Sequence, residues 1–237
     1  MINAIKKTTC VLAVLAATST AVMAESIDVK VIGTITPTAC KPTLGGGGTI
    51  DYGNIAPASL SNTTFTVLGE KQVDFSITCD APAKVAIHAV GSKADTATDV
   101  TKSTAGDYDI FAGTLFGTPA LGVAGLGASD GKNIGGYGIR LVPGTYTVDG
   151  NNADTITRSA ITGVWVPSAN LGAGSLFSTI YKELQISWAP KGTLTPMAFT
   201  TVAGKLGVQA YITKTSELDL SKPINLDGLT SLELVYL

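Results

Sequence analysis

Apolar and polar side chains alternate with a period of two residues along much of this chain, and this pattern most constrains its fold. Successive side chains of a β-strand point to opposite faces of the sheet, so the pattern is typical of strands with one buried face. Gly, Pro, Asn and Asp separate the alternating segments, and 145–148 leads into the turn dipeptide Asp149-Gly150. The segments lie at 27–31, 73–78, 84–88, 183–188, 208–212 and 232–237. No window has a helical stripe, so the sequence predicts an all-β domain, most simply a sandwich.

Residues 1–24 have the layout of a secretory signal peptide. Lysines at positions 6 and 7 precede an uncharged apolar stretch over 10–17, and small residues follow up to Ala24. The apolar stretch is too short to span a bilayer, although an uncleaved membrane anchor is the rival interpretation. We therefore expect an exported chain that begins at Glu25.

Export determines how the cysteines are interpreted. Cleavage after residue 24 would remove Cys10 and leave Cys40 and Cys79. Two cysteines without metal-ligand spacing in an oxidising compartment predict a disulfide. The 16 Lys and Arg residues against 18 Asp and Glu residues leave the chain near neutral, which argues against a basic nucleic-acid surface.

The sequence offers no candidate for catalysis or for a metal or cofactor site. His88 is the only histidine, it falls within a predicted strand, and no CxxC or HxxxH spacing could supply a zinc site. The glycine-rich stretch at 125–133 differs from a phosphate-binding loop, since Leu126 stands where the first glycine is required and Asn133 replaces the Ser or Thr. We predict that the protein is not an enzyme and binds no cofactor.

One region lacks the alternating pattern. Residues 92–135 are rich in Gly, Ala, Thr, Ser and Asp, and no linker or repeat divides the chain around them. We interpret them as long loops or an insertion at one end of the domain. The predicted organisation is a signal peptide at 1–24, an extension at 25–39 and one domain at 40–237 with an insertion within about 92–180.

The two ends of the mature chain and its cysteines carry a resemblance to a known family. The segment 26–40 is an alternating strand with no hairpin partner, and Gly33 lies seven residues before Cys40. The segments 49–55 and 73–79 follow, and the chain ends in an alternating strand with Tyr236 as its penultimate residue. This ordered set resembles the pilin subunits of bacterial chaperone–usher fimbriae, in particular the larger spore-coat-like or DUF1120-type fimbrial proteins.

The resemblance implies an immunoglobulin-like β-sandwich that lacks its last strand, with an N-terminal donor-strand extension. It also implies three kinds of partner: a periplasmic pilus chaperone, an outer-membrane usher and neighbouring fimbrial subunits. The function implied is that of a structural subunit of a surface fimbrium that contributes to adhesion. The implied donor-strand residues are Ile27, Val29, Val31, Gly33 and Ile35. The implied acceptor-groove and chaperone-contact residues are Leu232, Leu234, Tyr236 and Leu237.

Two alternatives and one departure from the family pattern remain. An outer-membrane β-barrel also has a signal peptide and Gly-rich alternating strands. A monomeric exported carbohydrate-binding sandwich could stack a sugar on Trp165 and Trp188. Family members often carry a glycine about 14 residues from the end, whereas Gly228 lies nearer to it, which leaves the start of the last strand open.

Overall fold

The computed structural model describes residues 30–33, 38–161 and 163–237, and its chain divides into two units, 1–36 and 37–237. In the first unit, residues 30–33 have no regular secondary structure, and the side chains of Val31 and Ile32 are exposed. The predicted signal peptide and the donor positions Ile27, Val29 and Ile35 lie outside the described residues.

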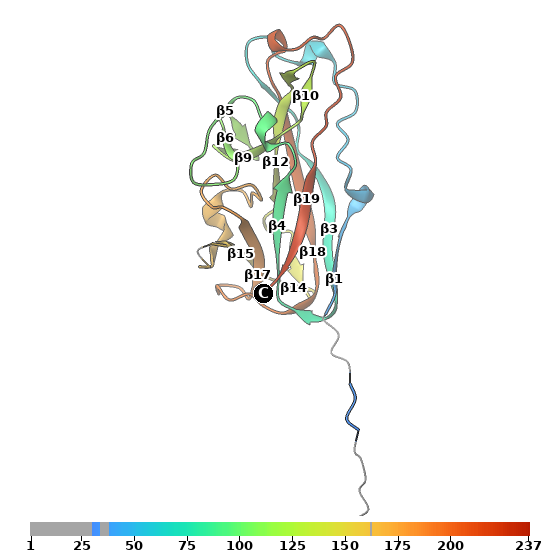
Figure 1. The fold of residues 1–237 in the computed structure, drawn as a ribbon, viewed down its shortest axis with the longest axis vertical. Coiled ribbons are helices and arrows are strands. Elements are labelled where there is room, and N and C mark those ends of the chain that lie inside the picture. The colour runs from blue at the N-terminus through green and yellow to red at the C-terminus, as the bar shows by residue number, and fades with distance from the viewer. Residues whose placement is uncertain (1–29, 34–37, 162) are drawn as a thin grey trace, which may run out of the picture. The chain divides into compact units, whose positions relative to one another are not determined.

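The described part of the second unit consists of antiparallel β-strands and short 3-10 turns, with no α-helix among those residues (Figure 1). This confirms the predicted all-β class. The first sheet has the order β1 (Cys40–Leu44), β3 (Lys71–Ala83), β18 (Phe199–Ile212), β12 (Gly135–Leu141), β9 (Gly122–Gly125), β6 (Asp109–Phe111) and β5 (Val100–Thr101). Its side branches are β2 (Thr66–Val67) and β13 (Thr147–Val148) on β18, and β14 (Asn151–Asn152) on β13.

The second sheet has five strands and shares its apolar core with the first. Its order is β16 (Val166–Pro167), β15 (Asp154–Ser159), β17 (Leu184–Ala189), β4 (Val85–Gly91) and β19 (Thr230–Tyr236). The fully buried Trp188 of β17 stacks on Phe75 of β3 and meets Phe199 of β18 edge-on, so aromatic rings join the two sheets.

The remaining elements are short. Two small hairpins pair β7 (Thr114–Leu115) with β8 (Thr118–Pro119) and β10 (Ala128–Ser129) with β11 (Lys132–Asn133). The 3-10 turns are η1 (Gly45–Gly48), η2 (Pro57–Ser59), η3 (Ala94–Thr96), η4 (Ser168–Leu171) and η5 (Thr215–Glu217).

The described alternating segments all contain strands. Those at 73–78, 84–88, 183–188, 208–212 and 232–237 fall within or overlap β3, β4, β17, β18 and β19. On β3, for example, Phe75 and Ile77 are buried while Asp74 is exposed. A strand with one face in the core explains this alternation.

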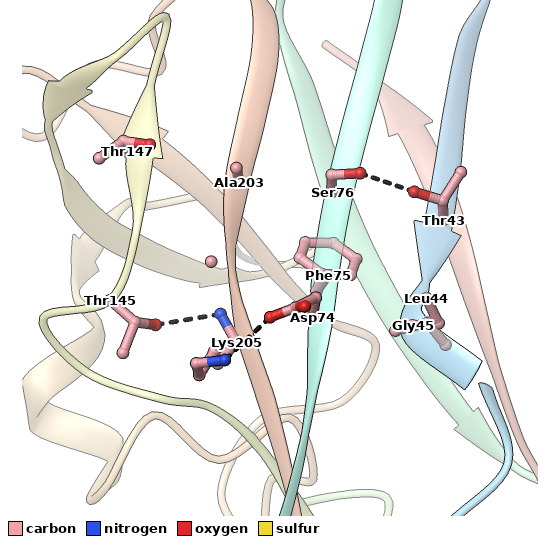
Figure 2. Close-up of a pocket in the computed structure, with 11 residues that line it drawn as sticks. Thr43, Leu44, Gly45, Asp74, Phe75, Ser76, Thr145, Thr147, Ala203 and Lys205 are labelled. Carbon is pink, nitrogen blue, oxygen red and sulfur yellow. Dashed lines mark hydrogen bonds and ion pairs between the residues drawn. The ribbon is translucent and has the colours of Figure 1, made fainter. Parts of the chain in front are cut away.

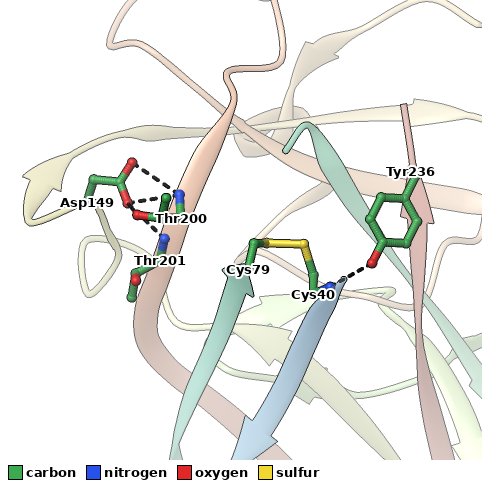
Figure 3. Close-up of a disulfide and its surroundings, with 6 residues drawn as sticks. All are labelled: Cys40, Cys79, Asp149, Thr200, Thr201 and Tyr236. Atoms are coloured by element: carbon green, nitrogen blue, oxygen red, sulfur yellow. Dashed lines mark hydrogen bonds between the residues drawn. A yellow bond between two sulfur atoms is a disulfide. The ribbon is translucent and has the colours of Figure 1, made fainter. Parts of the chain in front are cut away.

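The predicted hairpin turn at Asp149-Gly150 is also present. Both residues have positive φ, 48° and 78°, as a type I′ turn requires, and they connect β13 to β14. The Asp149 carboxylate accepts hydrogen bonds from the amides of Thr200 and Thr201 and from the Thr200 hydroxyl (Figure 3). These bonds, that from the hydroxyl above all, lower the pKa of Asp149.

Residues 92–135, predicted as long loops or an insertion at one end of the domain, are not simply loops. They form short strands, and Phe111, Leu115 and Val123 build a second apolar cluster against Tyr211 on the outer face of the first sheet. The glycines of β9 serve close packing, because a Cβ at Gly122 would lie 2.7 Å from the Phe177 carbonyl oxygen. Strands of two to four residues with glycine at packed positions show no alternation, and for this reason the pattern missed them.

Candidate strand-acceptor groove

The predicted disulfide between Cys40 and Cys79 is confirmed. Figure 3 shows the bond, and the two residues are directly opposite each other in the β1–β3 ladder. The same ladder pairs Leu44 with Phe75. The bond therefore holds the first residue of β1 to the middle of a long strand of the first sheet.

β1 and β19 each lie at an edge of a sheet. β1 ends the first sheet beside β3, and β19 ends the second sheet beside β4. β19 pairs with β4 along its whole length, from Thr230 opposite Gly91 to Tyr236 opposite Val85. Among the described residues, no strand pairs with the other side of β1 or of β19.

The two edges meet at one end. The Cys40 amide donates a hydrogen bond of 2.7 Å to the Tyr236 hydroxyl, as Figure 3 shows. The cause lies in the connection between the sheets: β3 ends at Ala83 and β4 begins at Val85, so the first residue of β1 and the last residue of β19 lie close together. We call the space between β1 and β19 the seam.

A groove of about 1070 Å³ lies between the segment that follows β1 and the segment that precedes β19. Its walls lie within 47–60 and 218–229 and consist of irregular backbone together with parts of the turns η1 and η2. Its floor is apolar and comes from the inner face of the first sheet. The floor residues include Val73, Ile134, Ile139, Leu206, Val208 and Ile212.

Hydrogen bonds fix both walls. On one side, the Tyr52 hydroxyl donates to the Val208 carbonyl and accepts from the Ala210 amide, each at 3.1 Å. Burial raises the pKa of Tyr52, so this hydroxyl stays protonated. On the other side, the Asp227 amide donates to the Leu126 carbonyl at 3.0 Å. The groove is therefore a fixed feature of the fold.

Gly228 determines how the last strand begins. A Cβ at Gly228 would lie 2.7 Å from Cε1 of Tyr137, and the Tyr137 hydroxyl is 2.6 Å from the hydroxyl of Thr230, the first residue of β19. Burial raises the pKa of Tyr137. This close approach of backbone to ring is possible only at glycine. The last strand thus starts two residues after Gly228.

Replacing Gly228 with alanine should lower stability by about 1–3 kcal/mol, because the added methyl group overlaps the Tyr137 ring. The expected fall in Tm is about 2–4 °C per kcal/mol in a domain of this size. Gly69→Ala is the matched control, since a Cβ there meets nothing within 4 Å and its φ is not positive. Equal Tm values for the two variants would contradict this account of Gly228.

The structure places the predicted acceptor residues at different points of this site. Leu232 lines the groove, and Leu234 packs against the shared core. Tyr236 closes the seam, and the side chains of Tyr236 and Leu237 are 52% and 42% exposed. Of the predicted donor residues, Val31 and Gly33 are described, and the Gly33 backbone is not in the positive-φ region that demands glycine.

Sequence reasoning missed most of the groove. The floor residues of β12 and β18 and the wall at 218–229 carry no local signal for such a site. The apolar residues Leu218, Leu220, Ile224, Leu226 and Leu229 in an irregular C-terminal segment were the one available hint.

The other residues considered as candidates for binding or catalysis are engaged in contacts within the fold. Trp188 is fully buried, so it cannot stack on a sugar in this structure, and the Arg158 guanidinium lies 4.6 Å from the centre of the Trp165 ring. His88 contacts the Leu184 carbonyl through Nδ1. Within the described ranges, no three His, Cys, Asp or Glu side chains are grouped to hold a metal ion.

A second hollow, of about 540 Å³, lies on the first sheet and is lined by β1, β3, β18 and the segment that enters β13 (Figure 2). Its polar side chains bond to one another: Lys205 pairs with Asp74 at 2.8 Å, and the hydroxyls of Thr43 and Ser76 are 2.6 Å apart. These four polar side chains therefore already have hydrogen-bond or ion-pair partners within the sheet.

Helices that could cross a bilayer are not found in the part of the chain that the structure describes.

Comparison with known proteins identifies relatives of the whole chain. The family described as "Protein of unknown function (DUF1120)" matches residues 29–138. Protein GltF of Escherichia coli K12 is 30% identical over 241 residues, which cover 95% of this chain and 94% of that protein. The chain belongs to the DUF1120 family. A second relative of this DUF1120 chain, the uncharacterized protein YhcF of Escherichia coli K12, is 30% identical over 223 residues, 90% of each protein. No solved structure matches it.

Proposed function

We propose that this chain is a structural subunit of a chaperone–usher fimbrium, exported through the periplasm to the cell surface, where it polymerises by accepting a β-strand from a neighbouring subunit. The observation that carries the proposal is the groove with an apolar floor, whose walls are the segment that follows the edge strand β1 and the segment that precedes the edge strand β19. In this proposal the fold is an immunoglobulin-like sandwich without its last strand, and the groove takes the place of that strand.

The isolated domain has two features that favour association with another chain, and addition of a strand would cover both. An edge strand presents unpaired backbone groups to any other chain, and an apolar hollow beside it invites association. A strand added in the seam would pair with those backbone groups, while its alternate side chains would enter the groove. One event would thus cover the backbone edge and the apolar floor.

The proposed occupant is the N-terminal extension of a second copy or of a related subunit. Ile27, Val29, Val31 and Ile35 share one face of this extension by alternation. Twelve residues at 25–36 span about 40 Å when extended, comparable with the 14-residue strand β18. Each buried aliphatic side chain contributes about 1.5–3 kcal/mol before the costs of ordering the strand.

The groove must be covered before a neighbour arrives, which gives the proposed chaperone its role. A periplasmic chaperone would lend a strand to the seam, and the extension of the next subunit would replace that strand at the usher. Adhesion would then follow from the assembled fimbrium.

Periplasmic co-purification tests this function. The exported full-length chain should be recovered with a fimbrial chaperone of similar size, and cells should show a ladder of SDS-resistant multimers. Cross-links between the chaperone and β19 should place the lent strand in the seam. Recovery of a stable, partner-free monomer that never forms multimers would contradict the proposal and favour a self-sufficient sandwich.

A further inference from the structure

The two ends of the seam differ. At one end the Tyr236 hydroxyl holds the Cys40 amide at 2.7 Å. Toward the other end the walls of the groove stand apart around a volume of about 1070 Å³. A strand added between β1 and β19 therefore meets an open end and a closed end.

Several bonds hold the closed end together. The disulfide ties Cys40 to Cys79, and the Asp80 amide donates to the Ala39 carbonyl at 3.0 Å. On the other sheet, the Leu237 amide donates to the Lys84 carbonyl at 3.0 Å. Lys84 is the single residue between β3 and β4, so the end of β19 is anchored to this short connection, while the start of β1 is anchored to Cys79 and Asp80 of β3.

We propose that the Tyr236 side chain is a removable stop that ends the acceptor seam. An added strand pairs alongside β19 from the open end as far as Leu234, and it goes no further while the Tyr236 hydroxyl holds the Cys40 amide. This inference rests on the proposed function, because it concerns how deeply a strand enters the same seam.

The geometry of Tyr236 supports this role. Tyr236 is opposite Val85 in the ladder, two residues after Leu234, so the alternation of β19 turns its ring to the same side as Leu234, toward β1. A strand that passed between Cys40 and Tyr236 would have to bond to the Cys40 amide, which already donates to the Tyr236 hydroxyl. It would also have to fill the space that the Tyr236 ring occupies. Tyr236 is 52% exposed and is not part of the shared core, so its ring can swing away into solvent. A stop that can be released in this way sets the register of the added strand.

Hydrogen exchange on the purified exported protein, kept dilute so that multimers do not form, tests the stop. The variant is Tyr236→Phe, which keeps the ring and removes the hydroxyl. Tyr181→Phe is the matched control, because Tyr181 precedes β17, which β4 separates from β19 in the second sheet. The Cys40 amide should exchange about five- to tenfold faster in Tyr236→Phe than in the wild type or in Tyr181→Phe.

The second measurement adds an excess of a synthetic peptide with the sequence of residues 25–36. In the wild type the peptide should protect the amides on the open side of β19 only up to Leu234, whereas in Tyr236→Phe the protection should extend to the amide of residue 236. Equal Cys40 exchange in the wild type and Tyr236→Phe, or wild-type protection by the peptide that already reaches the amide of residue 236, overturns the stop and leaves the proposed function standing. Absence of peptide protection anywhere on β19 overturns the proposed function, and the stop with it.

Discussion

Deleting residues 25–36 should abolish SDS-resistant multimers while leaving the rest of the chain folded and bound to its chaperone. The deleted residues precede the unit at 37–237, which contains both sheets and the shared core. Their apolar face would bury several aliphatic side chains in a neighbour, and without it the neighbour's groove stays empty. Chaperone co-purification reports the fold of the variant, and the multimer ladder reports its assembly.

Gly33→Leu should give the same loss of multimers with far less change to the chain. The resemblance assigns Gly33 to a shallow part of the groove, where a leucine side chain would block docking. The Gly33 backbone does not demand glycine, so the substitution should leave its own subunit intact. Thr34→Leu is the control, because alternation places residue 34 on the opposite face. Normal fibres on cells that express only Gly33→Leu subunits would falsify the donor-strand assignment.

The second large effect should come from removing the disulfide. Cys40→Ser combined with Cys79→Ser should lower the free energy of unfolding by about 4 kcal/mol, the value that the chain-entropy model assigns to a loop closed over 39 residues. Such a loss is a large share of the stability of a typical domain. It should also loosen the closed end of the seam, since Cys40 donates to Tyr236.

Urea unfolding of the purified protein measures this loss. The double variant Thr43→Ala with Ser76→Ala is the matched control, because it removes a neighbouring cross-strand pair from the same β1–β3 ladder. That pair of hydroxyls is exposed, and its removal should cost less than about 1 kcal/mol. Two thiols that react with an alkylating agent in native, unreduced protein would show instead that the bond does not form in the cell.

The local pattern was sufficient for β3, β4, β17, β18 and β19, which border the core. β3 and β19, for example, each keep one face in the shared core over several residues. Burial of one face produces an alternation that is visible within a few consecutive residues, so both strands could be predicted. The hairpin turn at Asp149-Gly150 was equally local, since it depends on two residues that tolerate positive φ. The disulfide followed from the two cysteines that remain, Cys40 and Cys79, if the predicted signal peptide is removed.

The groove depended on pairings that no local pattern reports. Its floor joins β12 to β18, whose partners Ile139 and Val208 are far apart in the sequence, and its two walls come from opposite ends of the domain. Glycine-rich short strands at 92–135 carried no alternation, because glycine there serves close backbone contact and adds no side chain to either face.

The positions of long strands that keep one face in the core, such as β3 and β19, were therefore predictable from the period of the side chains alone. Long-range contacts determine which strand edges stay unpaired. They also determine that these edges converge at Tyr236 and Cys40 and separate around the groove. Only the tertiary structure determines those contacts, because side-chain alternation shows that a face is buried but not which strand or wall buries it.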